Sequence, residues 1–556
     1  MKMHFADIWE TIADAFPDNE ALVHGEVRRS WRDYEDRAAR LAACYGGHGL
    51  APGAKVAVLA HNSPEHLEAH FAAYKMRAIP INVNYRYFED ELVYLFDNAD
   101  AEAVVFQARF AERLAAVRGR LPKLKLFIEI ADGSGLHLDG TLDFETTIAE
   151  AAPAPRIERS EDDHYMLYTG GTTGMPKGVI YRQGDFAAAL MLAFGWRGLE
   201  PPENGEQLIA AIEGLHAAGG AVRSIPGCPL MHGTGMWISA IASHNMGGCV
   251  ITFDNQHFDA GELWALAAAE KATDLVIVGD AFGKPMLQAL EAEKAAGRAY
   301  DLDALVMLIS SGVMFSREVK RRLLEHVDCN IIDAAGSTEG GIGNSVTNRE
   351  TPVGETARFE PNENTKVFTD DNREVVPGSG EIGMIANGGV CPLGYYKDPE
   401  KSALTFREID GHRYSFPGDF ATVAEDGTLV LLGRGSNCIN SGGEKVFPEE
   451  VEEVVKSHPS VYDCLVVGVP DERFGERVTA VASFQAGQAP GSDELIGWLH
   501  GRIAGYKLPK DIVAVAEVKR AANGKADYAW AKQTAVAEAK AEARGQVTRA
   551  TSSASP

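Results

Sequence analysis

Cysteine is scarce in this sequence and follows no pattern. The seven cysteines are scattered over 556 residues without a Cys-x-x-Cys pair, which argues against a disulfide framework and a zinc site and favours a reducing compartment. Long apolar runs are also missing. No stretch approaches the roughly 18 residues of a membrane-spanning helix, and residues 1–20 lack the apolar core of a signal peptide. We therefore expect a cytoplasmic protein with no integral membrane segment.

Positive charge is in deficit. Lysine and arginine total 53 against 79 for aspartate and glutamate, a formal net charge of −26, and this balance repels nucleic acids and anionic lipid surfaces. We therefore expect no nucleic-acid partner. A small phosphorylated ligand is still compatible, because its site needs only one or two cations and backbone amides. The 45% of hydrophobic and 24% of charged residues are typical of a folded globular protein, and the length suggests several domains, or one large domain with a smaller partner.

Strand-like and helix-like segments alternate through the first part of the chain. Residues 55–59 and 78–83 predict short buried strands, and residues 65–77 predict a helix between them. Further strand-like segments are 104–106, 124–130, 249–253, 275–278, 305–310 and 330–332, and further helical segments include 31–45 and 261–271. This alternation predicts an α/β fold with parallel sheets covered by helices.

The character of the chain changes after about Thr351. Glycine, proline and aspartate become frequent and hairpin signals such as residues 425–428 appear, which predicts a β-rich subdomain. We place a domain boundary at Arg434, so that residues 1–433 form a large N-terminal domain and residues 434–534 a small α+β C-terminal domain. Residues 535–556 lack apolar periodicity and are expected to form a frayed helix with a disordered end.

The most informative segment is 168–179, Tyr-Thr-Gly-Gly-Thr-Thr-Gly-Met-Pro-Lys-Gly-Val. Glycines let backbone amides approach phosphate oxygens, and threonine hydroxyls and a lysine add donors and a positive charge. The segment is not a Walker A loop, because the Gly-Lys-Ser/Thr ending is missing and Pro176 precedes the lysine. A surface hairpin loop rich in turn formers is the alternative. The phosphate-binding loop that we favour consists of Thr169, Gly170, Gly171, Thr172, Thr173, Gly174 and Lys177.

Further motifs follow this loop or precede it in a fixed order. They are His-Asn-Ser at 61–63, Ile-Asn-Val-Asn-Tyr-Arg at 81–86, Pro-Leu-Met-His-Gly-Thr-Gly-Met-Trp at 229–237, Gly-Ser-Thr-Glu at 336–339, Gly-Asp at 418–419, Gly-Arg at 433–434, Ser-Gly-Gly-Glu at 441–444 and Asn-Gly-Lys at 523–525. In these motifs and their order the chain resembles the adenylate-forming superfamily, which includes acyl-CoA synthetases, aryl-CoA ligases, peptide-synthetase adenylation domains and beetle luciferases. The resemblance covers nearly the whole chain.

The resemblance implies an acid–CoA ligase, in which ATP and a carboxylic acid form an acyl-adenylate and coenzyme A then takes the acyl group. Lys177 and the loop threonines would hold the β- and γ-phosphates, and Glu339 offers Mg²⁺ a hard oxygen ligand. By the resemblance, Thr338 contacts the α-phosphate and Lys525 stabilises the transition state of adenylation. Further ATP contacts are expected from Ser311, Gly312, Val313, Asp333, Ala334, Ala335, Gly336 and Ser337, and from Asp419 and Arg434 at the ribose.

Plain structural roles stay open for several of these residues. Glu339 could be a helix-capping charge, Asp419 a solvated turn residue and Lys525 an exposed loop lysine. The family commonly has an aromatic residue that stacks on adenine where this chain has Ala335. We therefore expect the adenine base to pack against residues 311–313 instead.

The second half-reaction is expected to use a mobile C-terminal domain that swings about a hinge at Ser436. The family usually has acidic residues here, but Ser436 and Asn437 are small and polar and can still absorb backbone rotation. Ser441, Gly442 and Gly443 are expected near the pantetheine arm of coenzyme A, although a glycine pair can equally be a plain turn.

The acid-pocket motif contains His232, for which two roles stay open: direct contact with the carboxylate or the thiol tunnel, and a neutral core histidine. Residues 231–237 include no acidic side chain to anchor a substrate amine, which disfavours an amino-acid-activating domain. Small residues leave volume for a bulky hydrophobic acid, and the phosphate loop followed by Arg182 and Gln183 resembles bacterial ligases for fatty or steroid side-chain acids. Aryl-alkanoic acids are also compatible. The expected pocket residues are His232, Thr234, Gly235, Trp237, Gly312 and Gly340.

Two other classes of protein stay open. One is an adenylating enzyme that loads the phosphopantetheine of a carrier protein, which would form a thioester with the carrier and none with free coenzyme A. The other is a non-catalytic nucleotide-binding relative, against which the retained Lys177, Glu339 and Lys525 argue. For the oligomeric state, a homodimer is our working expectation.

Overall fold

A computed structural model of the chain describes residues 2–170, 175–253, 258–351, 358–441, 444–471, 475–521 and 524–552, with the backbone alone from residue 541 onward. The chain divides into two compact units. The first unit consists of Met1–Val353 with Asn387–Ser415, and the second of Gly354–Ala386 with Phe416–Pro556. The expected domain boundary at Arg434 lies inside the second unit and stays a prediction.

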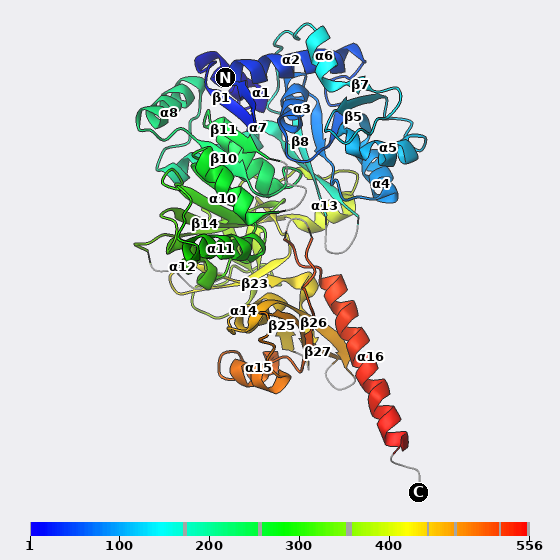
Figure 1. Cartoon of the computed structure of the whole chain (residues 1–556), viewed down its shortest axis with the longest axis vertical. Helices are drawn as coiled ribbons and strands as arrows, with labels where there is room; N and C mark the ends of the chain where they lie inside the picture. Colours follow the sequence, from blue (N-terminus) through cyan, green and yellow to red (C-terminus); the bar gives the residue numbers. More distant parts are fainter. Residues whose placement is uncertain are drawn as a thin grey trace. The chain divides into compact units, whose positions relative to one another are not determined.

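A five-stranded parallel sheet in the order β4-β3-β5-β6-β7 belongs to the first unit. Its strands are β3 (Lys55–Leu59), β4 (Ile79–Asn82), β5 (Ala101–Gln107), β6 (Leu126–Ile130) and β7 (Leu142–Asp143). One face packs against α2 (Trp31–Gly47), α3 (Pro64–Lys75) and α6 (Phe144–Glu150), and the other against α4 (Glu89–Ala99) and α5 (Ala111–Arg118) (Figure 1). Because both faces are buried, the central strands β3 and β5 consist mainly of apolar residues, as the sequence predicted for residues 55–59 and 104–106.

Helices α2 and α3 begin where the sequence supplies caps. The Ser30 hydroxyl accepts a hydrogen bond from the Asp33 backbone N–H at 3.1 Å, and the Asp33 carboxylate accepts one from the Ser30 backbone N–H, so a capping box starts α2. Ser63 accepts a bond from the His66 backbone N–H at 3.4 Å, and Pro64 occupies the first turn of α3. The caps fix the points at which the two helices begin.

The second sheet of the first unit has the order β2-β1-β11-β10-β12-β13-β14-β15. It is parallel from β1 to β14, and an antiparallel strand follows at each end. The strands are β1 (Glu20–His24), β2 (Val27–Ser30), β10 (Arg223–Pro226), β11 (Cys249–Thr252), β12 (Asp274–Ile277), β13 (Met307–Ser311), β14 (Asn330–Ser337) and β15 (Gly340–Thr347). Helices α10 (Ala260–Ala269), α11 (Gly279–Ala295) and α12 (Arg317–Leu324) pack against it.

A small antiparallel sheet in the order β19-β9-β8 is completed by a segment that returns to the first unit late in the chain. The elements of this region are β8 (His164–Thr169), β9 (Lys177–Arg182), β19 (Gly394–Tyr395), α13 (Pro399–Thr405), β20 (Phe406–Ile409) and β21 (His412–Ser415). The other helices of the first unit are α1 (Phe5–Ala15), η1 (Ala108–Phe110), α7 (Gln183–Met191), η2 (Leu192–Arg197), α8 (Gly205–Ala217), the π-helix η3 (Thr234–Ile241) and α9 (Ala242–Asn245).

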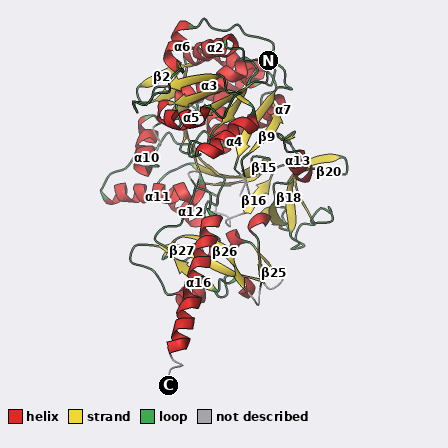
Figure 2. Ribbon diagram, turned by 90° about the vertical axis from the view of Figure 1, so that its right-hand side faces the viewer, coloured by secondary structure: helices red, strands yellow, loops and turns green. Residues whose placement is uncertain are grey.

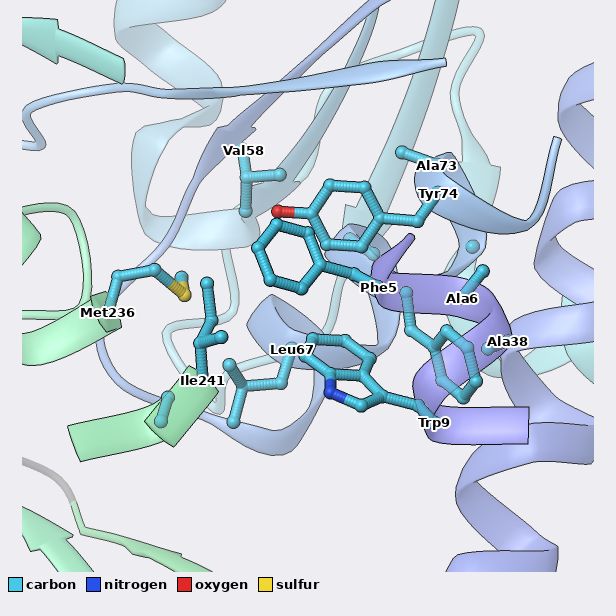
Figure 3. Packing of buried hydrophobic residues seen from close by; sticks show 14 of the residues in the cluster. Phe5, Ala6, Trp9, Ala38, Val58, Leu67, Ala73, Tyr74, Met236 and Ile241 are labelled. Carbon is cyan, nitrogen blue, oxygen red and sulfur yellow. The ribbon is translucent and has the colours of Figure 1, made fainter. Parts of the chain in front are cut away.

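Aromatic side chains occupy the centre of a large buried cluster in the first unit (Figure 3). The ring centroids of Phe5 and Trp9, both on α1, lie 5.2 and 5.8 Å from that of Tyr74. Met236 and Ile241 of η3 belong to the same cluster. The core therefore anchors η3, and with it the rest of the 229–237 motif.

The second unit contains the predicted β-rich region. Its strands are β16 (Arg358–Pro361), β17 (Thr365–Phe368), β18 (Gly383–Asn387), β22 (Asp419–Val423) and β23 (Leu429–Arg434). β22 pairs antiparallel with both β18 and β23, and β23 pairs antiparallel with β16. The hairpin signal at 425–428 is confirmed, because this segment connects β22 to β23.

A further sheet of the second unit has the order β25-β24-β27-β26, with β28 beside β27. Its elements are η4 (Gly435–Asn437), β24 (Ile439–Ser441), β25 (Glu444–Val446), α14 (Pro448–Lys456), β26 (Val461–Asp471), β27 (Gly475–Phe484), α15 (Ser492–Leu499), η5 (Gly505–Lys507), β28 (Asp511–Ala514) and α16 (Tyr528–Ser552). Helices α14 and α15 pack against one face. Helix α16 runs along the sheet (Figure 2) and buries Ala531 and Ala535 against the other face. Helix α16 extends through most of the segment expected to fray.

The layered arrangement confirms the predicted α/β class. Parallel sheets with helices on their faces make up most of the first unit, and an α+β sheet ends the second. Within the ranges that the structure describes, no helix combines the length and the apolarity needed to cross a bilayer.

Candidate active site

The two ends of the predicted phosphate loop lie side by side. Thr169 ends β8 and Lys177 begins β9, and the two residues are paired across these antiparallel strands. Gly170 is exposed. Gly171, Thr172, Thr173 and Gly174 lie outside the described residues. The pairing places the two described ends of the predicted phosphate loop next to each other.

Lys177 lies over an aromatic ring and beside a carboxylate. Its Nζ is 3.5 Å from Oδ2 of Asp398 and 5.2 Å from the ring centroid of Tyr395. The side chain of Lys177 keeps 34% of its surface exposed. An exposed ion pair of this kind contributes little to stability, so the lysine charge is available to an anionic ligand.

Hydroxyl groups from other strands hold the turn that carries Thr338 and Glu339. Tyr181 on β9 donates a hydrogen bond to the Thr338 carbonyl at 2.8 Å. Tyr395 on β19 donates to Oε1 of Glu339 at 2.7 Å, and Ser415 on β21 donates to the Glu339 carbonyl at 2.9 Å. Glu339 is half-buried. The turn between β14 and β15 is therefore fixed from three strands, and the helix-cap alternative does not apply to a residue in this turn.

The predicted nucleotide segments follow adjacent parallel strands. Ser311 at the end of β13 is paired with Ala334 on β14, and Ala335, Gly336 and Ser337 complete that strand. Gly312 has a φ of +96°, a backbone conformation that favours glycine. Val313 is half-buried and packs against the core. The carboxyl ends of parallel strands form a common edge, where open sheets bind ligands.

Asp333 is buried below this edge. Its Oδ2 lies 3.4 Å from Nζ of Lys320, and burial raises the pKa of Asp333 to about 6, against the opposing effect of Lys320. Because the Asp333 carboxylate is buried with a lysine, its geometry supports a role in holding β14 and α12 together. A direct ATP contact by Asp333 stays a prediction.

Two of the predicted acid-pocket segments come together. A Cβ at Gly312 would lie 3.7 Å from Oγ1 of Thr234, so the end of β13 faces the start of η3. Trp237 donates a hydrogen bond from Nε1 to the Tyr165 hydroxyl at 2.6 Å. At Gly235 a side chain would collide with the Pro229 carbonyl. These contacts orient the half-buried Thr234 and Trp237 beside β13.

The other two pocket predictions have different surroundings. His232 is half-buried, and its carbonyl accepts a hydrogen bond from the Met236 backbone N–H at 2.9 Å. Gly340 packs so closely against the side-chain amide of Asn387 that a Cβ would collide with it. The direct and the structural role of His232 therefore both stay open.

In the second unit, the predicted ribose residues form a pair. Asp419 begins β22 and Arg434 ends β23, and they are partners across the two strands. Nε of Arg434 is 3.3 Å from Oδ1 of Asp419, which is 8% exposed. The solvated-turn alternative for Asp419 does not fit this burial. Ser436 in η4 is exposed, Ser441 ends β24, and Gly442 and Gly443 lie outside the described residues.

A partly buried ion pair lies next to Lys525. Arg520 donates from Nε and Nη2 to Oδ2 and Oδ1 of Asp463 at 2.7 and 2.8 Å, and from Nη1 to the Gly524 carbonyl at 3.1 Å. Gly524 has a φ of +71°, which favours glycine. Lys525 is exposed. The hydrogen bond from Arg520 therefore holds the backbone at Gly524, directly before Lys525.

Two buried asparagines play a part that the motifs did not reveal. The Asn82 side-chain N–H groups donate to the carbonyls of Tyr168 and Met231 at 2.8 and 2.7 Å, and its Oδ1 accepts the Tyr168 backbone N–H at 2.7 Å. Asn62 likewise contacts the carbonyl of Cys228 at 3.0 Å and the backbone N–H of Leu230 at 2.7 Å. The two asparagines belong to the motifs at 61–63 and 81–86. Their place in these motifs was the sequence feature that could have identified them. Asn82 joins the phosphate loop to the acid-pocket segment.

The residues fit Mg²⁺ held jointly with phosphate. Within the described ranges, no three His, Cys, Asp or Glu side chains gather as a metal cluster. Mg²⁺ in nucleotide sites is commonly bound by one or two carboxylates together with phosphates and water. Glu339 supplies such a carboxylate, and it shares a contact residue, Tyr395, with Lys177 of the loop.

Comparison with known proteins identifies the family. A family model described as "AMP-binding enzyme" matches residues 9–396, and one described as "AMP-binding enzyme C-terminal domain" matches residues 450–525. The chain belongs to the AMP-binding enzyme family, which confirms the resemblance to adenylate-forming enzymes.

Several curated relatives cover the chain nearly end to end. A 3-oxocholest-4-en-26-oate–CoA ligase of Rhodococcus rhodochrous is 42% identical over 540 residues, which are 96% of each chain. A medium/long-chain-fatty-acid–CoA/3-oxocholest-4-en-26-oate–CoA ligase of Mycolicibacterium smegmatis is 40% identical over 541 residues, again 96% of each chain. The medium-chain acyl-CoA ligase Mig of Mycobacterium avium is 38% identical over 95% of this chain and 97% of its own.

Solved structures share the fold at lower identity. The anthranilate CoA ligase AuaEII in complex with anthranoyl-AMP matches with a TM-score of 0.82 at 22% identity, over 97% of this chain and 98% of its own. ATP-bound MatB from Rhodopseudomonas palustris matches with a TM-score of 0.79 at 23% identity, over 96% and 99%. These likenesses confirm the fold.

Proposed function

We propose that this protein is an ATP-dependent acid–CoA ligase for hydrophobic carboxylic acids. The observation that carries the proposal is the convergence on Tyr395 of Lys177, from the phosphate loop, and Glu339, from the turn after β14. The family and the names of the relatives support the same activity. ATP and coenzyme A are the cosubstrates.

In the first half-reaction a carboxylate oxygen of the acid attacks the α-phosphorus of ATP. The bond from this phosphorus to the bridging oxygen breaks, and pyrophosphate leaves with its electron pair. Charge develops on the phosphate oxygens, and donors fixed beforehand stabilise it. We assign this role to Lys177, Thr169 and Thr338, together with the loop residues 171–174. Mg²⁺, with Glu339 as its protein ligand, would neutralise phosphate charge when bound.

The motifs that contain Asp419, Arg434 and Lys525 are the source of the remaining ATP contacts in this proposal. The paired Asp419 and Arg434 offer two acceptor oxygens and a donor to the ribose hydroxyls. Lys525 adds a positive charge to the transition state of adenylation. In the second half-reaction the sulfur of coenzyme A attacks the acyl carbonyl and AMP leaves, with Ser441, Gly442 and Gly443 as the proposed contacts of the pantetheine arm and Ser436 as the hinge.

The proposed acids are bulky and apolar, such as steroid side-chain acids and medium- to long-chain fatty acids. The half-buried Thr234 and Trp237 lie beside β13, where Gly312 adds no side chain. No acidic residue in 231–237 would bind a substrate amine. The relatives named above are CoA ligases for such acids.

A panel of acids tests this function. We expect AMP and pyrophosphate release that requires ATP, Mg²⁺, coenzyme A and a hydrophobic acid, with steroid side-chain and long-chain acids ahead of short-chain and amino acids. The measurement is a coupled assay of AMP with mass detection of the acyl-CoA. A thioester formed only on a carrier protein, or no pyrophosphate with any acid, would reject the proposal.

The two half-reactions can be separated at Lys525. Lys525→Ala should lower acid-dependent ATP–pyrophosphate exchange by about a hundredfold, because a charge that acts in the transition state is lost. Thioester formation from a supplied acyl-adenylate should stay near the wild-type rate. Lys519→Ala is the matched control in the same unit. Equal loss of both half-reactions in Lys525→Ala would contradict the assigned role.

A further inference from the structure

Tyr395 occupies a buried position between Lys177, the predicted phosphate ligand, and Glu339, the predicted metal ligand. It belongs to β19, which pairs antiparallel with β9, and its cross-strand partner is Val179, two residues after Lys177. The residue is 8% exposed, and its ring centroid lies 5.3 Å from that of Phe406. Strand pairing and ring packing therefore fix the direction of the phenol.

The Tyr395 side chain interacts with both Glu339 and Lys177. The Tyr395 hydroxyl donates to Oε1 of Glu339 at 2.7 Å, and Nζ of Lys177 lies 5.2 Å from the centre of its ring. A hydrogen bond to a carboxylate is stronger than one between neutral groups, and it restricts the rotation of the carboxylate. With Oε1 engaged, Oε2 is left to point in a defined direction. The Lys177 ammonium group is likewise attracted to the face of the Tyr395 ring, which restricts its position.

We propose that Tyr395 is a positioning residue for adenylation, which orients the Glu339 carboxylate toward the metal–phosphate group and fixes Lys177 above its ring. This inference rests on the proposed function. Tyr395 itself exchanges no proton and forms no bond with substrate in this role. Groups that orient a metal ligand commonly change metal affinity by ten- to a hundredfold when they are removed.

Two substitutions separate this role from plain packing. Tyr395→Phe removes the hydroxyl and keeps the ring against Phe406 and under Lys177. Tyr396→Phe is a matched control, because the Tyr396 hydroxyl also donates to a carboxylate at 2.7 Å, that of Asp100, which we place outside the site. Both variants lose one phenol oxygen from a hydrogen bond of the same length. A purely structural role would make them behave alike.

The experiment follows Mg²⁺ dependence in the full-length protein. ATP–pyrophosphate exchange is measured over a range of Mg²⁺ for wild type, Tyr395→Phe, Tyr396→Phe and Glu339→Gln, and melting temperatures are recorded for each. Binding of α,β-methylene-ATP at the same Mg²⁺ concentrations is measured by calorimetry, which gives a readout independent of turnover.

For Tyr395→Phe we expect a roughly tenfold higher Mg²⁺ concentration at half-maximal exchange and a matching loss of analogue affinity at low Mg²⁺. Exchange should recover at saturating Mg²⁺, and Glu339→Gln should shift the profile in the same direction. Tyr396→Phe should keep the wild-type profile. A Tyr395→Phe profile equal to that of wild type, or equal shifts in both tyrosine variants, would overturn the inference. Wild-type protein without exchange would instead reject the proposed function.

Discussion

Glu449 is a half-buried acid with a buried Oε2 atom at the start of α14, close to the end of β23. A side chain at Gly433 would collide with the Glu449 carboxylate, so this carboxylate packs against the backbone next to Arg434. Burial and the neighbouring Glu452 raise the pKa of Glu449 well above its ordinary value near 4.5. The residue thus opposes folding at neutral pH, where its charge is costly, and yet it lies directly beside the proposed ribose donor Arg434.

Glu449→Gln should stabilise the protein at neutral pH. Between the ordinary and the raised pKa, the folded state keeps a proton that the unfolded state releases, so the stability of the wild type falls as pH rises through this window. Glutamine has no such titration. We expect a gain of about 1 to 2 kcal/mol at pH 7.5 that shrinks toward pH 4.5.

The measurement is chemical denaturation of both proteins across this pH range. Glu450→Gln is the control, because Glu450 pairs with Lys507 at 2.7 Å and its loss should bring no gain. A Glu449→Gln effect independent of pH would show that the carboxyl titrates normally in the folded state.

Among the elements, the ends of β3 and β4 connect the first sheet to the site. Asn62 follows β3, and Asn82 is the last residue of β4. Asn62 binds the end of β10 and the segment after it, through Pro226, Cys228 and Leu230. Asn82 binds this segment at Met231 and also binds Tyr168 at the end of β8. Asn82 thus sets the spacing between the phosphate loop and the acid-pocket segment.

Asn82→Ala should raise the KM for ATP as well as the KM for the acid. The substitution leaves buried backbone groups of Tyr168 and Met231 without their partner, at a cost of about 3 kcal/mol in the free energy of unfolding. Asn62→Ala should cost a similar amount and raise the KM for the acid alone. Steady-state kinetics with denaturation curves compare the two variants. Equal effects on both KM values in both variants would contradict the division of roles.

Regular elements were largely predictable from the sequence. The strand predicted at 55–59 has the same first and last residues as β3. The helix predicted at 31–45 corresponds to α2, which continues for two more residues. Both follow from apolar periodicity and caps, which act within a few residues. The π-helix η3 and the two-residue strand β19 were not predicted. Their conformations depend on packing against β10, β12 and β13 and on pairing with β9, and such partners are distant in the sequence.

Across the whole molecule, the motifs name candidate substrate contacts but not the residues that support them. A phosphate or a metal requires particular side chains, so Lys177 and Glu339 could be named from the sequence alone. Tyr181, Tyr395 and Ser415 could not, because the partner of a hydroxyl is set by the fold and not by its neighbours in the chain. The net charge of −26 likewise gave no sign of a local cation at the loop.

The first unit is interrupted in the chain, and this has a consequence for its synthesis. The segment Asn387–Ser415 joins it only after Gly354–Ala386, which belongs to the second unit. A nascent chain that has left the ribosome up to Val353 therefore has β9 without its partner strand β19. Lys177 then has neither the Tyr395 ring nor the Asp398 carboxylate beside it. The nucleotide binding that we propose for this loop is accordingly a late event in biosynthesis, since the neighbours of Lys177 are present only once residues 387–415 have emerged.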